Sequence, residues 1–201
     1  MHIVFIWIQG SWKWTQSRIL QEEKWFKSFE TGQALRNITK QDTDLWKLVK
    51  QTIETGKQVT PDIVEDILKD YIKTVDTDDI IFDGLVRNIW NKETADKILE
   101  KWYKVVFFDL DEKEAMKRLL WRKYNPKTWE TFMGWIEIDP KTWDKLVKRS
   151  DDEENSIKQR IKEFYDKTLP VVDLYEKEWK LIKINANQSV DKVTNEILSV
   201  F

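Results

Sequence analysis

The sequence predicts an α/β fold, a three-layer sandwich in which a parallel sheet of about five strands has helices on both faces. Two observations lead to this prediction. Strand-like and helix-like segments alternate along the chain, which is typical of the strand–helix–strand units that build a parallel sheet. The first segment, residues 1–6, is continuously apolar and rich in β-branched side chains, as expected of a strand buried on both faces.

The remaining elements follow the same alternation. After the first strand, a short loop leads into a helix expected over residues 13–24. Short apolar runs predict further strands at residues 79–82, 104–110 and 180–185. Amphipathic patterns predict helices over residues 44–55, 61–73, 92–101, 112–123, 153–169, 171–177 and 190–200. Thr60 and Pro61 are expected to begin one of these helices, and Asp111 with Glu114 to cap another.

One stretch, residues 124–148, interrupts this pattern. It has little helical periodicity and contains the turn-forming pairs Asn125-Pro126 and Asp139-Pro140. We therefore expect it to form a lobe or lid inserted between two helices of a single domain.

Composition predicts a soluble protein and excludes several kinds of site. The chain has 201 residues, of which 35% are charged, and its mean hydropathy is −0.61. No apolar stretch approaches the roughly 20 residues that cross a bilayer, and the apolar start is too short for a signal peptide, so a cytoplasmic location is expected. The net charge of −2 argues against nucleic-acid binding. With no Cys and a single His, disulfides, a cysteine zinc site and a His-based triad are excluded.

Tryptophan is unusually frequent in this chain, and glycine is unusually rare. There are 12 Trp and 5 Gly, so glycine makes up about 2.5% of the residues against an average of roughly 7%. Residues 7–15 read W-I-Q-G-S-W-K-W-T. With glycine written for Trp7, Trp12 and Trp14, this becomes a G-x-x-x-x-G-K phosphate-loop pattern that ends on Thr15 and directly follows the first strand.

We interpret most or all of the 12 Trp as occupying glycine codon positions. The simplest cause is a UGA codon that is translated here as Trp and that the source organism reads as Gly. The alternative is a natural Trp-rich protein that uses its aromatic side chains for packing or binding. The distinction matters because glycines let backbone N–H groups close around a polyphosphate, and tryptophan lacks that conformational freedom.

Five further motifs follow the loop in order. They are E-T-G-Q-A-L-R from Glu30, G-K-Q-V-T from Gly56, F-D-G-L-V-R-N from Phe82, R-L-L-W-R from Arg118, and K-R-S-D-D from Lys148 with Arg160 beyond it. With the loop, their order and spacing resemble adenylate kinase, a nucleoside monophosphate kinase, in its long-lid bacterial type. The resemblance covers essentially the whole chain, and six motifs in register are specific although each alone is modest.

The resemblance also bears on the tryptophans. Several of them stand where the family has glycine or a turn, namely Trp25, Trp46, Trp121, Trp129, Trp143 and Trp179. Four of the five glycines, Gly10, Gly32, Gly56 and Gly84, lie on family glycines. A Trp-rich protein of unrelated origin is not expected to divide its residues in this way.

The resemblance implies reversible phosphoryl transfer from MgATP to AMP, giving two ADP. It implies Mg²⁺ as cofactor, no structural zinc, ATP, AMP and ADP as partners, no nucleic acid or membrane, and a monomer. It also implies three parts: a core of residues 1–29, 60–121 and 150–201, an AMP-binding lobe of residues 30–59, and a lid of residues 122–149. Hinges are expected near residues 121–122 and 149–150, since closure must exclude water from the transferring phosphate.

Site residues follow from the same resemblance. Catalytic roles fall to Lys13, Arg87, Arg122, Arg149 and Arg160. ATP binding falls to Gly10, Ser11, Trp12, Lys13, Trp14, Thr15, Arg118 and Arg122. AMP binding falls to Thr31, Arg36, Val59, Gly84, Arg87 and Asn91. Mg²⁺ is expected near Thr15, and near Asp83 through water. Arginine suits such a site because its planar fork matches phosphate oxygens and never loses its charge.

Two departures leave alternatives open. The family's D-G-F-P-R is here D-G-L-V-R from Asp83, and Asn91 is shorter than the family's glutamine. A UMP/CMP-type kinase is one alternative, although Thr31 stands where those enzymes usually carry Ala. A catalytically dead, Trp-rich interaction protein is another. For the chain as written we expect poor ATP binding and little kinase activity, because Trp12 and Trp14 flank Lys13.

Overall fold

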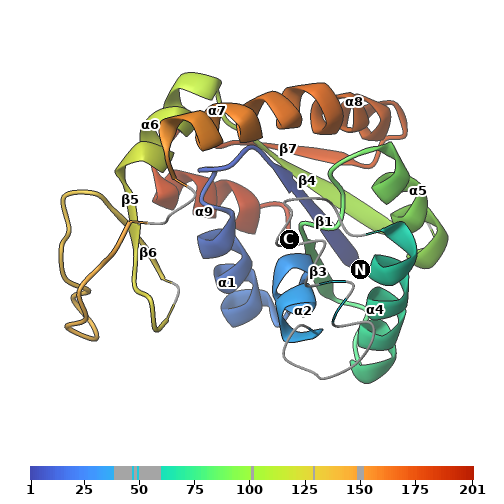
Figure 1. Cartoon of the computed structure of the whole chain (residues 1–201). Helices are drawn as coiled ribbons and strands as arrows, with labels where there is room; N and C mark the ends of the chain where they lie inside the picture. Colours follow the sequence, from blue (N-terminus) through green and yellow to red (C-terminus); the bar gives the residue numbers. More distant parts are fainter. Residues whose placement is uncertain (39–46, 48, 50–59, 101, 129, 149–151) are drawn as a thin grey trace.

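A five-stranded parallel sheet forms the centre of the computed structural model, which describes the chain except for residues 39–46, 48, 50–59, 101, 129 and 149–151. The strands run in the order β2-β3-β1-β4-β7 (Figure 1). Their bounds are β1 (His2–Trp7), β2 (Lys27–Glu30), β3 (Ile80–Asp83), β4 (Tyr103–Asp109) and β7 (Leu181–Asn185). Each neighbouring pair is parallel, which confirms the predicted α/β class.

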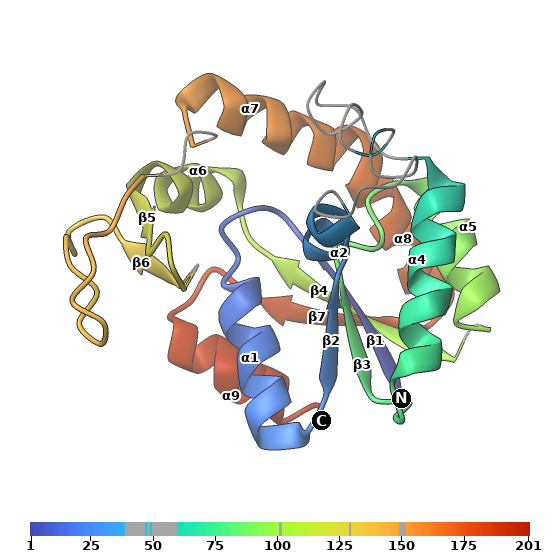
Figure 2. The same ribbon diagram turned by 60° about the horizontal axis from the view of Figure 1, so that its bottom comes forward.

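Helices cover both faces of this sheet. They are α1 (Lys13–Lys24), α2 (Thr31–Ile38), α4 (Pro61–Thr74), α5 (Ile89–Ile98), α6 (Glu112–Trp121), α7 (Glu154–Glu163), α8 (Leu169–Lys177) and α9 (Val190–Leu198). Between α7 and α8 the chain forms a π-helical turn, Phe164–Thr168. Figures 1 and 2 show α1 and α9 on one face, and α4, α5 and α8 on the other.

Most predicted boundaries agree with these elements, and the exceptions have local causes. Helix α5 begins at Ile89, three residues before the predicted start, because the Asn88 side chain caps it by accepting from the backbone N–H of Asn91 at 2.9 Å. Asp111 caps α6 in the same way through the N–H of Glu114 at 2.8 Å, as predicted. Thr60 makes no such side-chain bond. The predicted helix over residues 44–55 falls largely outside the described residues.

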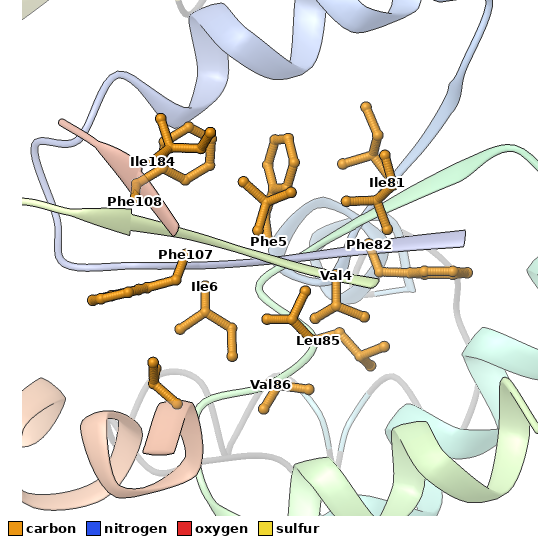
Figure 3. Close-up of a cluster of buried hydrophobic side chains, with 14 of the residues drawn as sticks. Val4, Phe5, Ile6, Ile81, Phe82, Leu85, Val86, Phe107, Phe108 and Ile184 are labelled. Atoms are coloured by element: carbon orange, nitrogen blue, oxygen red, sulfur yellow. The ribbon is translucent and has the colours of Figure 1, made fainter. Parts of the chain in front are cut away.

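Strand β2 escaped the sequence prediction because it is a short edge strand. Its sequence, KSFE, buries only Phe29, so it carries no apolar run. The central strands β1 and β4 instead bury nearly every side chain. Figure 3 shows why: Phe5 points to one face with Phe108 and Ile184, whereas Val4 and Ile6 point to the other. Burial on both faces explains the continuous apolar sequences of these strands.

Residues 122–128 and 130–148 form antiparallel structure outside the main sheet (Figure 1). Strands β5 (Arg122–Tyr124) and β6 (Thr131–Met133) pair with each other, and two isolated bridges continue the pattern. The interior is polar: the Asn125 amide donates to Asp139 at 2.7 Å and to Thr142 at 2.8 Å. Both Asn125 and Asp139 are fully buried. A hydrogen-bond network therefore holds this unit together.

No helix in the described part of the chain is long and apolar enough to cross a membrane.

Candidate active site

The loop between β1 and α1 lies at the carboxyl edge of the parallel sheet. It ends at the N-terminus of α1, where unpaired N–H groups and the helix dipole favour an anion. Gly10 adopts φ +95°, and a Cβ there would lie 3.3 Å from the carbonyl oxygen of Ala115. Trp12, the residue before α1, adopts a left-handed conformation with φ 64°. The strand–loop–helix arrangement predicted for the phosphate loop is therefore present.

A cleft of about 590 Å³ opens beside this loop and gathers most of the predicted site residues. The predicted residues that line it are Gly10, Ser11, Trp12, Lys13, Trp14, Thr15, Asp83, Gly84, Arg87, Arg118, Arg122 and Arg160. Thr31 and Asn91 are not among its lining residues. Val59, Arg149 and the Arg36 side chain lie outside what the structure describes.

The Lys13 ammonium is held between two groups of the cleft. It forms an ion pair with the carboxylate of Asp83, at the end of β3, and lies 3.9 Å from the ring centre of Trp7. Asp83 itself is almost fully buried. Next to it, Gly84 has φ +74°, and a Cβ added there would lie 3.6 Å from the Trp7 ring. The Trp7 ring thus occupies the space between the loop and the end of β3.

Arg122 and Arg160 converge on one buried carboxylate. Arg122 donates to the two oxygens of Asp152 at 2.8 and 2.7 Å, and Arg160 donates to the same group at 2.9 Å. The Asp152 side chain is completely buried. Asp152 thus holds the two guanidinium groups together at the wall of the cleft. Asp152 belonged to a motif quoted from the sequence, but no role had been assigned to it.

Arg118 contacts the loop before α1 through its guanidinium group. Its guanidinium donates to Glu114 at 2.8 Å and to the carbonyl oxygen of Gly10 at 3.3 Å. It also lies 5.1 Å from the ring centre of Trp12. The Arg118 side chain is mostly buried. It therefore both lines the cleft and holds the loop in place through these contacts.

Thr168 connects the π-helical turn to the loop after β3. Its hydroxyl donates to the carbonyl oxygen of Arg87 at 2.9 Å. On the same loop, the backbone N–H of Arg87 donates to the side-chain oxygen of Asn91 at 3.2 Å. The Asn91 amide oxygen is therefore bonded to the backbone of this loop. Thr168 also lines the cleft, together with Glu163, Phe164 and Lys167.

Sequence reasoning missed these four residues. Helical periodicity cannot reveal a π-helical turn, which shifts side chains from their regular positions and recurs at functional sites.

Two hard oxygen donors in the cleft fit Mg²⁺ bound together with a nucleotide. Thr15 and Asp83 both line it, and Mg²⁺ commonly takes one or two protein oxygens while substrate phosphates and waters complete its shell. Across the described residues, no cluster of three or more His, Cys, Asp or Glu could hold a metal by itself.

Comparison with known proteins agrees with this geometry. The family model for adenylate kinase matches residues 6–180. The adenylate kinase of Borrelia duttonii is 31% identical over all of this chain and 97% of its own length. The adenylate kinase of Thermotoga neapolitana is 30% identical over 99% of this chain, and that of Onion yellows phytoplasma 30% over all of it. These relatives cover both the loop and the arginine cluster, and the chain belongs to the adenylate kinase family.

Proposed function

We propose that the protein transfers a phosphoryl group reversibly from MgATP to AMP, giving two ADP. The observation that carries this proposal is the cleft itself, which is lined by Lys13 and by arginines from separate segments, among them Arg87, Arg122 and Arg160. Phosphoryl transfer depends on positioning and charge neutralisation, with little covalent chemistry for the protein to perform. A cleft with cations on several sides meets that requirement.

ATP phosphates would bind at the loop before α1. Backbone N–H groups and the N-terminus of α1 would face the anion, and Lys13 would reach the β and γ phosphates. The Lys13 ammonium pairs with Asp83 in this structure, so binding requires it to share or leave that carboxylate. Asp83 would then have an oxygen available to help hold Mg²⁺ through water.

The arginine cluster would face the transferring phosphoryl group. Asp152 holds Arg122 and Arg160 in fixed orientations before any substrate arrives, which lowers the entropic cost of binding. By resemblance, Arg149 joins them. Guanidinium groups pre-set in this way stabilise the charge that spreads over the phosphoryl oxygens.

AMP would bind at the loop after β3. Arg87 and Arg36 would hold its phosphate, and Thr31, Val59, Gly84 and Asn91 would surround the nucleoside. The Thr31 hydroxyl is buried with no hydrogen-bond partner among the described residues, and it lies beside Gly84. A buried hydroxyl left unpaired is destabilising, and a bound ligand could satisfy it.

The residues around the cleft would divide into a core of residues 1–29, 60–121 and 150–201, an AMP-binding lobe of residues 30–59 and a lid of residues 122–149. Closure about hinges near 121–122 and 149–150 would exclude water from the phosphoryl group. Thr15, and Asp83 through water, would hold Mg²⁺ together with ATP, and the ion would neutralise phosphate charge. We expect a cytoplasmic monomer without structural zinc that binds neither nucleic acid nor membrane.

A coupled ADP-formation assay with AMP, UMP and CMP tests this function on the protein with glycine at the 12 Trp positions. We expect turnover with AMP and far less with the pyrimidine nucleotides. Arg160→Ala should abolish most of the turnover, whereas Lys158→Ala, an exposed cation on the same helix, should not. Equal rates with UMP or CMP would contradict the assignment of AMP, and an unimpaired Arg160→Ala would contradict the phosphoryl site.

A further inference from the structure

Tryptophan dominates the left-handed residues of this backbone. Among the described residues, five that are not glycine have positive φ: Glu100 at 48°, and Trp12, Trp25, Trp143 and Trp179 at 64°, 62°, 61° and 58°. Trp accounts for 12 of the 201 residues of the chain, yet for four of these five positions. A bulky side chain in this region is a genuine outlier, because its Cβ crowds the following carbonyl oxygen. Glycine adopts the same conformation freely.

Trp179 occupies a helix end that normally calls for glycine. Its N–H donates to the carbonyl oxygen of Glu176 at 3.0 Å, and the next N–H, of Lys180, donates to Tyr175 at 3.1 Å. This pair of bonds is the Schellman motif, in which the left-handed residue just after a helix is usually glycine. Trp25 ends α1 in the same conformation, with its N–H bonded to the carbonyl oxygen of Leu20.

The three left-handed tryptophans outside the cleft expose their indole rings to solvent. Trp25, Trp143 and Trp179 are 84%, 80% and 88% exposed, although tryptophan is on average among the more buried residue types. They also do not form one surface. Trp25 precedes β2 at one edge of the sheet, Trp179 precedes β7 at the opposite edge, and Trp143 lies in the antiparallel unit. A binding surface built from aromatic side chains would gather them.

Trp12 carries the same conformation inside the cleft. It precedes the first residue of α1, yet its side chain makes no capping bond. Its indole N–H is buried without a hydrogen-bond partner in the described part of the chain. The Trp12 side chain therefore neither caps the helix nor satisfies its own polar atom.

We infer that the functional form of this protein carries glycine at positions 12, 25, 143 and 179, because the codon translated here as Trp is read as glycine in its own cell. The inference rests on backbone dihedrals, capping bonds and exposure, and it does not require the proposed kinase activity. The same codon is then expected at the other Trp positions, including Trp7 and Trp14.

Tandem mass spectrometry of the protein isolated from its source organism tests this directly, with the gene sequence beside it. We expect UGA codons and glycine-containing peptides at positions 12, 25, 143 and 179, and ordinary GGN codons at Gly10 and Gly84. Tryptophan in the peptides at these four positions, or UGG codons there, overturns the inference.

A stability experiment on the recombinant chain gives an independent test. The substitutions Trp25→Gly, Trp143→Gly and Trp179→Gly should each raise the Tm, because each relieves a left-handed tryptophan far from the arginine cluster. The matched control is Trp90→Gly, since Trp90 is also exposed, at 65%, but lies in the first turn of α5. Glycine inside a helix is unfavourable, so the control should lower the Tm or leave it unchanged. A lower Tm for all three left-handed positions overturns the inference, whatever the protein does with nucleotides.

Discussion

The two sides of the cleft use different parts of the chain. On one side, Arg122 and Arg160 would act through their side chains, which are oriented by hydrogen bonds to the buried Asp152. On the other side, the loop before α1 would act through its backbone N–H groups, which requires residues without bulky side chains. The arginine side is intact in this chain, whereas the loop side carries Trp7, Trp12 and Trp14.

This difference explains how the chain can retain a full set of charged site residues beside a damaged loop. Gradual loss of function would be expected to remove arginines as readily as glycines. A change confined to glycine codons instead leaves every charged side chain in place and harms only sites that depend on a bare backbone. The difference between the two sides therefore separates a translation effect from functional decay.

The largest effect is expected from restoring glycine to the loop. With glycine at all 12 Trp positions, kcat/KM should exceed that of the chain as written by at least 10²–10³-fold, the order of loss known for removing fixed N–H donors from an active site. Restoring only positions 7, 12 and 14 should recover ATP binding more than turnover, since Trp121, Trp135 and Trp143 remain in and beside the antiparallel unit. Isothermal titration with ATP and the ADP assay measure the two effects.

Full activity of the chain with all 12 Trp would break the comparison. It would mean that the loop binds phosphate although Trp7, Trp12 and Trp14 carry bulky side chains. The loop would then not require glycine, and the contrast with the arginine side would disappear.

The arginine side can be tested by changing Asp152, which orients Arg122 and Arg160. Asp152→Asn should lower turnover strongly and destabilise the protein by about 3 kcal/mol, the lower end for removing one partner of a buried ion pair, because both guanidiniums keep some exposure. Glu153→Gln, at the exposed neighbouring position, is the control and should leave both properties unchanged. Chemical denaturation and the ADP assay measure the effects; an unchanged kcat in Asp152→Asn would show that the arginines need no orienting group.

The loop side was predictable from sequence, and part of the arginine side was not. An apolar strand followed by a glycine-type loop and a helix is a local pattern, so residues 1–24 could be assigned from their own letters. The convergence of Arg122 and Arg160 on Asp152 depends on packing between α6 and α7, which sequence spacing does not reveal. Strand β2 was missed because its pairing with β3, not its composition, makes it a strand.

Thr168 offers a smaller effect, on the side of the cleft proposed to bind AMP. Its hydrogen bond to the carbonyl oxygen of Arg87 makes it a positioning residue for that loop. Thr168→Val should raise the KM for AMP roughly fivefold, equivalent to a net hydrogen bond of about 1 kcal/mol, with little change in the KM for ATP. Thr168→Ser keeps the hydroxyl and should restore the KM for AMP. Equal changes in both KM values would indicate a general loss of structure in place of local positioning.

The smallest effect is expected in the antiparallel unit, and it appears only at acid pH. Burial raises the pKa of Asp139, but hydrogen bonds from Asn125, from the N–H of Lys141 and from Thr142 outweigh it and hold the pKa below the ordinary value. A carboxyl group with a lowered pKa in the folded state stabilises the fold above its unfolded pKa, and this stability is lost as the pH falls through the folded pKa. Amide hydrogen exchange of residues 122–148, corrected for the intrinsic pH dependence, should therefore show protection at neutral pH that declines below about pH 4, the ordinary pKa of Asp. Asn125→Ala should weaken the protection at neutral pH and reduce its dependence on pH, while the parallel sheet keeps its own protection. Protection that persists at low pH, or that falls equally in the sheet and in this unit, would show that the polar network does not control the stability of this region.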